Sequence, residues 1–193
     1  MKNIVLLTLF SLAVMGTAHA EKADSEKEAV ITAQRGQVDD VKQTRTLTGD
    51  VVLVKGTLTM KAGRALITED PQGYQFITFW ADPGKLATFR QKRDGAGDLW
   101  VEGEAERVEY DNKTEVVKLF SKAKVTRLEG TKVTDVANGA FISYDSRKEV
   151  FQMENTNSGT STPDGGSVRM VIQPKTKAPA AEKAPATPAP GTK

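Results

Sequence analysis

The stretch Tyr110-Asp111-Asn112-Lys113-Thr114-Glu115-Val116-Val117-Lys118-Leu119 recurs 34 positions later as Tyr144-Asp145-Ser146-Arg147-Lys148-Glu149-Val150-Phe151-Gln152-Met153. In both copies a short polar turn separates two segments in which apolar and polar residues alternate. Short polar side chains bond their own backbone in turns, and this alternation is typical of strands, so each copy predicts a hairpin. A weaker third copy runs from Asp39 to Leu47, 72 positions before the first. The chain is therefore predicted to consist of repeated hairpins, which bury one face and leave open strand edges.

Strands are predicted throughout residues 30–173, and no helix is. Apolar residues seldom recur at three and four positions, whereas β-branched residues and glycines are frequent. The predicted strands are Val51–Val54, Leu58–Met60, Phe76–Trp80, Leu86–Phe89, Trp100–Ala105, Val116–Phe120, Ala123–Thr126, Ala140–Tyr144, Val150–Met153 and Val168–Ile172. An all-β, antiparallel domain is therefore expected.

The first twenty residues have the features of a secretory signal peptide. Lys2 gives the positive start, residues 4–15 form an apolar run, and Ala18-His19-Ala20 supplies a small-x-small cleavage site. The run is shorter than the roughly 20 apolar residues of a membrane span, so a membrane anchor is the less favoured alternative. We expect export and cleavage after Ala20, followed by a short leader over residues 21–29.

The last twenty residues, 174–193, differ in composition from the rest of the chain. Five of the eight prolines lie there among alanine, lysine and threonine, with no aromatic or large aliphatic residue. Such a segment cannot bury enough apolar surface to offset the entropy of ordering. A disordered tail is therefore expected after residue 173.

The residue types that are missing exclude several kinds of site. The chain has no cysteine and one histidine, His19, which the expected cleavage removes. Without imidazole or thiol, neither a Ser-His-Asp or Cys-His catalytic site nor a usual zinc site can form. With 27 basic against 25 acidic residues, the chain has no charge excess for binding nucleic acid. We therefore predict a protein that is not an enzyme and uses no cofactor or metal.

Three weak signals of other functions remain. The glutamates of Glu102–Glu106 could serve glycoside hydrolysis, but on one strand face they are more typical of a solvated charge stripe. Ser121–Lys124 has the spacing of a serine–lysine nucleophile, yet it lies within predicted strands, where that chemistry is not expected. Trp80 and Trp100 could stack sugars on an exposed sheet. A secreted glycan-binding module is therefore the alternative function.

Comparison of the repeats predicts which side chains face inward. When Leu47–Val54 is aligned with Leu119–Thr126, some positions are apolar in both copies, and the positions between them carry lysine in the second copy. Because successive strand side chains point to opposite faces, the positions that are apolar in both copies are predicted to face inward. The inward residues predicted in this way are Leu47, Val51, Leu53, Val108, Tyr110, Val117, Leu119, Val125, Ile142, Tyr144, Phe151 and Met153. Leu58, Met60, Ala87 and Phe89, on other predicted strands, are assigned to the same inner face. Patterning alone favours a closed core, and it leaves open an apolar groove for acyl chains.

Several motifs, in order, resemble a known family. Leu47–Leu58 (LTGDVVLVKGTL) is similar to its opening repeat, and Gly84–Phe89 and Val101–Ala105 are similar to its central motifs. Val117–Ala123 is similar to its second repeat, with Ser121-Lys122 where the family usually has Gly-Asn. These motifs resemble the organic-solvent-tolerance A (OstA-like) family, the periplasmic lipopolysaccharide-transport bridge proteins of the Lpt system in Gram-negative bacteria. The resemblance covers about residues 30–174.

The resemblance implies an elongated, open β-jellyroll whose apolar interior shields the acyl chains of lipopolysaccharide, so that the sixteen inward residues become groove candidates. It implies a periplasmic carrier that assembles head to tail and moves lipopolysaccharide from the inner to the outer membrane. The implied partners are an inner-membrane-anchored Lpt protein of the same fold and the N-terminal domain of the outer-membrane lipopolysaccharide translocon. Docking through strand edges would involve Ile31 and Thr32 at one end and Met170 and Ile172 at the other.

Overall fold

The computed structural model describes residues 24–174, which form twelve antiparallel strands. The all-β prediction is confirmed. None of the described residues belongs to a helix with the length and apolar character needed to cross a membrane. The predicted signal peptide, and the predicted tail except Pro174, lie outside the described residues.

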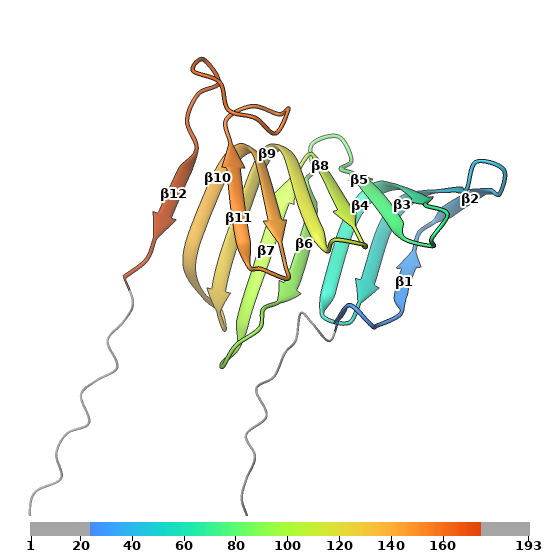
Figure 1. The fold of residues 1–193 in the computed structure, drawn as a ribbon, viewed down its shortest axis with the longest axis horizontal. Helices are drawn as coiled ribbons and strands as arrows, with labels where there is room; N and C mark the ends of the chain where they lie inside the picture. Colours follow the sequence, from blue (N-terminus) through green and yellow to red (C-terminus); the bar gives the residue numbers. More distant parts are fainter. Residues whose placement is uncertain (1–23, 175–193) are drawn as a thin grey trace, which may run out of the picture.

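The sheet is folded into two leaves, because four long strands bend and take part in both. These are β3 (Thr44–Lys55), β4 (Leu58–Glu69), β9 (Val116–Glu129) and β10 (Lys132–Asp145). The first leaf also contains β2 (Arg35–Asp39), β5 (Gln75–Trp80), β8 (Arg107–Asp111) and β11 (Val150–Glu154). The second leaf also contains β1 (Ala29–Thr32), β6 (Ala87–Lys92), β7 (Leu99–Ala105) and β12 (Arg169–Ile172). Figure 1 shows the strands crossing the long axis, with β12 at one end and β1 and β2 at the other.

A crease separates the two leaves. The pairing of β3 with β4 shifts register between residues 48 and 51, where Gly49-Asp50 has φ angles of 81° and 44°. At the aligned position in β9, Ser121-Lys122 has φ angles of 63° and 55°. Such bulges bend a strand and increase its twist, so each long strand passes from one leaf into the other. Hydrogen bonds continue across the crease. The Ala81 N–H donates to the Glu106 carbonyl, and the Glu106 N–H donates to the Ser121 carbonyl, each at 3.0 Å.

The crease explains where the predicted strand boundaries are wrong. Val116–Phe120 and Ala123–Thr126 are the two halves of β9, and β4 and β10 extend well beyond the predicted ranges. The polar pair Ser121-Lys122 at the bulge interrupts the apolar pattern of β9, so this one bent strand has the sequence pattern of two short strands. In β4 and β10 the buried positions change parity at the crease, which limited the predicted ranges there to one side of the bend. The mainly exposed strand β2 has no counterpart among the predicted strand ranges, although the third repeat implied a hairpin there, because its five residues include one large apolar side chain, Val38.

The three repeats are hairpins of the first leaf, as predicted: β2–β3, β8–β9 and β10–β11. In each turn an aspartate Oδ1 accepts a hydrogen bond from the backbone N–H three residues later, at 3.0–3.2 Å; the aspartates are Asp39, Asp111 and Asp145. The residue after that N–H has a left-handed φ of 50–57° in all three turns: Gln43, Glu115 and Glu149. The sequence repeat therefore encodes the same turn geometry three times, and in each turn the aspartate carboxylate satisfies a backbone N–H.

Candidate functional site

The space between the leaves is where the predicted inward residues meet. Thirteen of the sixteen are buried: Val51, Leu53, Leu58, Met60, Ala87, Phe89, Val108, Tyr110, Val117, Leu119, Val125, Ile142 and Tyr144. Leu47, Phe151 and Met153 are half-buried and pack against the same cluster. Their burial agrees with the inward direction inferred from the repeats, while their role in binding acyl chains stays a prediction.

Each leaf carries a row of paired inward residues that crosses all eight of its strands. In the second leaf the row is Ile31, Leu53, Met60, Phe89, Gly103, Val125, Ala137 and Met170. In the first leaf it is Gly36, Leu47, Ala65, Phe79, Val108, Leu119, Ile142 and Met153. Both rows contain only apolar residues, so an apolar surface continues from one edge strand to the other.

An aromatic column joins the two leaves. Phe89 of β6 stacks on Tyr144 of β10 with ring centroids 6.3 Å apart, and Tyr144 stacks on Phe151 of β11 at 4.4 Å. The guanidinium of Arg127, on β9, lies 4.5 Å from the Phe151 centroid. The column therefore begins at the buried ring of Phe89 and ends at the cationic guanidinium of Arg127.

Gly103 makes room for this column. It pairs with Phe89 across β6 and β7, and a Cβ at this position would collide with the Phe89 ring and lie 2.9 Å from Leu119 Cδ2. Val51, Leu53 and Leu119 have no exposed surface. In this structure the protein's own side chains therefore fill the interior as a closed core.

Polar contacts join the leaves at the margin opposite the crease, which we term the mouth. Three side chains of the second leaf, Lys55, Arg93 and Arg127, contact the turns of the first-leaf hairpins. Lys55 Nζ donates to Asn112 Oδ1 at 3.3 Å, and Arg93 Nη2 donates to Glu149 Oε2 at 2.6 Å. Arg127 Nη2 donates to the Glu149 carbonyl at 3.1 Å. The mouth is therefore closed by hydrogen bonds, whereas the crease is closed by continuous strands.

Asp24 adds a further closure near the β3–β4 turn. It is 5% exposed and accepts hydrogen bonds from the Thr57 N–H at 2.8 Å, Thr57 Oγ1 at 2.5 Å and Gln91 Nε2 at 3.4 Å. A Cβ at Gly56 would collide with its carboxylate. Sequence patterning missed this contact, because residues 21–29 have the composition of a leader and a single buried aspartate has no periodic pattern.

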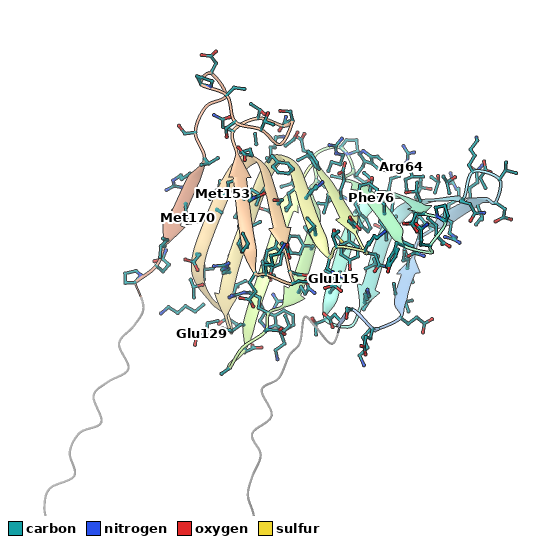
Figure 2. The ribbon with its side chains drawn as sticks, in the orientation of Figure 1. Arg64, Phe76, Glu115, Glu129, Met153 and Met170 are labelled. Atoms are coloured by element: carbon teal, nitrogen blue, oxygen red, sulfur yellow. The ribbon has the colours of Figure 1, made fainter. Side chains whose placement is uncertain are left out.

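Buried ionisable groups lie beside Asp24 at the mouth. Burial lowers the pKa of Lys55, although the carboxylates of Glu115 and Asp24 oppose this effect. Burial also raises the pKa of Tyr110, and the charges of Glu115 and Asp24 raise it further. Glu115, labelled in Figure 2, pairs with Arg147 Nε at 3.2 Å. The mouth therefore holds acidic and basic groups that are partly withdrawn from water.

The raised pKa of Tyr110 predicts a loss of stability at high pH. An unfolded tyrosine ionises near pH 10, whereas folded Tyr110 keeps its proton. Above about pH 10 the unfolded state binds fewer protons than the folded state, so the free energy of unfolding falls by up to about 1.4 kcal/mol per pH unit. Tyr110→Phe removes this contribution, and urea unfolding between about pH 9 and 11 should show a shallower decline than in the wild type. Parallel declines in the two proteins would contradict the prediction.

The outer face of the second leaf carries charged residues in pairs. Glu102, Glu104 and Glu106 pair with Arg90, Lys124 and Lys122 respectively. A hollow of about 440 Å³ on this face is lined by the first two pairs together with Thr59, Lys61, Thr88 and Thr126. Among residues 24–174, no group of three metal-binding side chains converges. The pairing agrees with a solvated charge stripe more than with a catalytic carboxylate pair.

The edge strands hold the four residues predicted for docking. β1 and β12 are the outer strands of the second leaf, and β2 and β11 are those of the first. Ile31 and Thr32 lie on β1, whereas Met170, labelled in Figure 2, and Ile172 lie on β12. Met170 is 50% exposed and Ile172 is 70% exposed. The edges of the first leaf were not part of the prediction.

Comparison with known proteins places this architecture in a family. Residues 30–150 match the family described as "LptA/(LptD N-terminal domain) LPS transport protein". The lipopolysaccharide export system protein LptA of Haemophilus influenzae is 27% identical over 159 residues, which cover 82% of this chain and 87% of that protein. LptA of Escherichia coli K12 is 29% identical over 136 residues, covering 68% of this chain and 71% of its own.

A related fold has been solved from Pseudomonas aeruginosa. The crystal structure of LptH, described as the LptA-homologous periplasmic component of the lipopolysaccharide transport device, superposes with a TM-score of 0.66 at 24% identity. The match covers 78% of this chain and 99% of LptH, so it supports the jellyroll fold. Since the family match spans more than half of the sequence, the chain belongs to the LptA/LptD N-terminal domain family of lipopolysaccharide transport proteins.

Proposed function

We propose that this protein is a non-enzymatic, periplasmic carrier that moves lipopolysaccharide from the inner to the outer membrane. The acyl chains lie between the two leaves, shielded from water by the inward residues. Copies of the chain dock head to tail through their edge strands. The ends of the assembly dock onto an inner-membrane-anchored Lpt protein of the same fold and onto the N-terminal domain of the outer-membrane translocon.

The pair of apolar rows carries this proposal. Each row crosses eight strands and ends on an edge strand, so docking a second copy at that edge would extend the apolar surface without a polar break. Edge strands offer backbone donors and acceptors for pairing with another strand. A core that served only stability would not need its apolar rows to reach both edges, where Met170 is half exposed.

The glycan-binding alternative has less support from the structure. The guanidinium of Arg90 lies 4.2 Å from the centroid of the Trp100 ring, and that of Arg64 lies 4.9 Å from the Trp80 ring. Lys92 Nζ lies 5.9 Å from the Trp100 ring as well. These cations occupy ring surface on which a sugar would stack.

A photo-crosslinker at Phe151 should capture lipopolysaccharide. Phe151 is half-buried on the inner face of β11, so p-benzoylphenylalanine replaces one aromatic ring with another and points toward the proposed acyl chains. Gln152, the next residue, is exposed and serves as the matched control. Irradiation with purified lipopolysaccharide should label the Phe151 variant at least about tenfold more than the Gln152 variant, because adjacent strand residues face opposite sides. Equal labelling at the two positions would rule out an interior path for the lipid.

Proline at Met170 should block assembly without unfolding the chain. The Gln173 N–H donates to the Thr134 carbonyl of β10 at 2.8 Å, and alternate residues of a strand direct their N–H groups the same way. The Val171 N–H therefore faces β10, whereas the Met170 N–H faces the open edge. Proline cannot donate a hydrogen bond, so Met170→Pro removes a docking bond and leaves the β10–β12 pairing in place.

Val171→Pro is the matched control, since it removes a bond within the sheet and should release β12. Light scattering over a concentration series should show wild-type rods that grow with concentration and smaller species for Met170→Pro. Circular dichroism should show that Met170→Pro keeps the wild-type fold. If Met170→Pro neither reduces self-association nor weakens binding to the two Lpt partners, docking through β12 is wrong.

A further inference from the structure

Two arginines at the mouth have buried donors without a hydrogen-bond acceptor. Among the described residues, the Nε–H groups of Arg93, Arg107 and Arg127 are buried and unpaired within the protein. Arg93 and Arg127 line one hollow of about 750 Å³, whereas Arg107 lies at the crease over Phe120. Unpaired buried donors are costly and rare, so two around one hollow suggest a ligand or ordered water there.

The hollow lies where the inner face changes from apolar to charged. The row next to the apolar row of the second leaf, on the side of the mouth, is Gln91, Val101, Arg127, Asp135 and Ile172. Leu99 and Ile172 also line the hollow. An amphiphile with its chains along the apolar rows would place its polar group at this row.

The two guanidinium groups are held in fixed positions. Arg93 is bonded through Nη2 to the Glu149 carboxylate, and its side chain is 15% exposed. Arg127 is bonded through Nη2 to the Glu149 carbonyl and stacks on Phe151. In both, the buried Nε–H has no acceptor within the described residues, and this group is one half of the fork that guanidinium groups use for phosphate.

Charges around the hollow are mixed. Lys132 adds a cation, and Glu129 and Asp135 add carboxylates, of which Asp135 accepts a hydrogen bond from Thr134 Oγ1 at 3.1 Å. Burial lowers the pKa of Arg127, and the nearby charge of Arg93 lowers it further, although Asp135 and Glu149 oppose both effects. Arg93, Arg127 and Lys132 are matched in number by Glu129, Asp135 and Glu149, yet the Nε–H groups of the two arginines have no acceptor among the described residues.

We propose that Arg93 and Arg127 together bind a phosphate monoester at the mouth. This inference rests on the proposed function, since lipopolysaccharide carries phosphate groups next to its acyl chains. The phosphate oxygens would accept hydrogen bonds from the two free Nε–H groups, and the acyl chains would continue along the apolar rows. Free inorganic phosphate offers the same chemistry and is the other source of such a group.

The test compares two lipids and one inorganic probe on the full chain. Binding of lipid A with two phosphates is measured against the same lipid after phosphatase treatment, for wild type, Arg93→Met, Arg127→Met and the double variant. Methionine keeps an unbranched apolar stem and removes only the guanidinium, which in Arg127 lies over Phe151. Arg90→Met is the matched control, because Arg90 lies on β6, three residues before Arg93, but pairs with Glu102 on the outer face.

We expect wild type and Arg90→Met to prefer the phosphorylated lipid by about tenfold, and the double variant to bind both lipids equally. On the wild type alone, the phosphorylated lipid should protect Arg93 and Arg127 from phenylglyoxal, as read by mass spectrometry. This second measurement does not depend on the folding of any variant.

The outcomes separate the two proposals. Equal binding of both lipids by the wild type, without protection of the arginines, overturns the phosphate site and leaves lipid carriage intact. If neither lipid binds but inorganic phosphate protects both arginines, lipid carriage fails and the site is one for free phosphate. A preference for phosphorylated lipid that survives in the double variant also overturns the assignment to these two residues.

Discussion

Gly103→Ala should lower the free energy of unfolding by about 3 kcal/mol, the upper end of the usual cost of overpacking a core. The new methyl group would occupy the space of the Phe89 ring, and Leu119 Cδ2 lies 2.9 Å away. Phe89 is the first ring of the column that joins the leaves, so its ring cannot move without disturbing Tyr144. Urea unfolding of the two proteins measures the difference.

Phe89→Leu should suppress the effect of Gly103→Ala, since it removes the ring with which the methyl group collides. The double-mutant cycle should therefore show coupling of at least about 1 kcal/mol between the two positions. Gly36→Ala is the matched control: Gly36 lies on the edge strand β2, and its Cβ would meet only the end of the Leu47 side chain, at 3.2 Å. A cost for Gly103→Ala no larger than for Gly36→Ala would show that the interior is not packed as described.

Locking the mouth should abolish lipopolysaccharide binding. The interior is filled, so acyl chains can enter only if the leaves separate, and the polar contacts at the mouth are what must open. The chain has no cysteine, so Lys55→Cys and Asn112→Cys can be joined across the mouth by a reducible bismaleimide. We expect affinity to fall by more than about a hundredfold, equivalent to roughly 2.7 kcal/mol, and to recover on reduction.

The control for the lock joins two residues of one leaf. Thr88→Cys and Glu104→Cys are paired neighbours on the outer faces of β6 and β7, so linking them leaves the mouth free to open. This protein should bind lipopolysaccharide like the wild type, before and after reduction. If the locked mouth binds lipid as well as the control does, the chains do not enter by separation of the leaves.

The repeated turns and the direction of the inward residues were available from the sequence. Asp39, Asp111 and Asp145 mark the same turn three times, because each carboxylate accepts a hydrogen bond from a backbone N–H three residues later. Such a bond depends only on residues that are neighbours in the chain, so the sequence pattern reveals it. Alternation around Val51 and Leu119 predicted burial, since a strand has only two faces. The family resemblance, carried by Leu47–Leu58 and Val117–Ala123, is supported by the match over residues 30–150.

The mouth was decided by the tertiary structure alone. Arg93, Arg127 and Glu149 are far apart in the sequence and have no spacing that marks them, yet the folding of the two leaves brings them into contact. Asp24 is buried because the β3–β4 turn offers it the N–H of Thr57 beside Gly56, and no local pattern encodes that contact. The sequence determines which face of each strand is apolar. Only the bend at the crease decides which polar side chains meet at the opposite margin, because that depends on how far each strand extends beyond the bend.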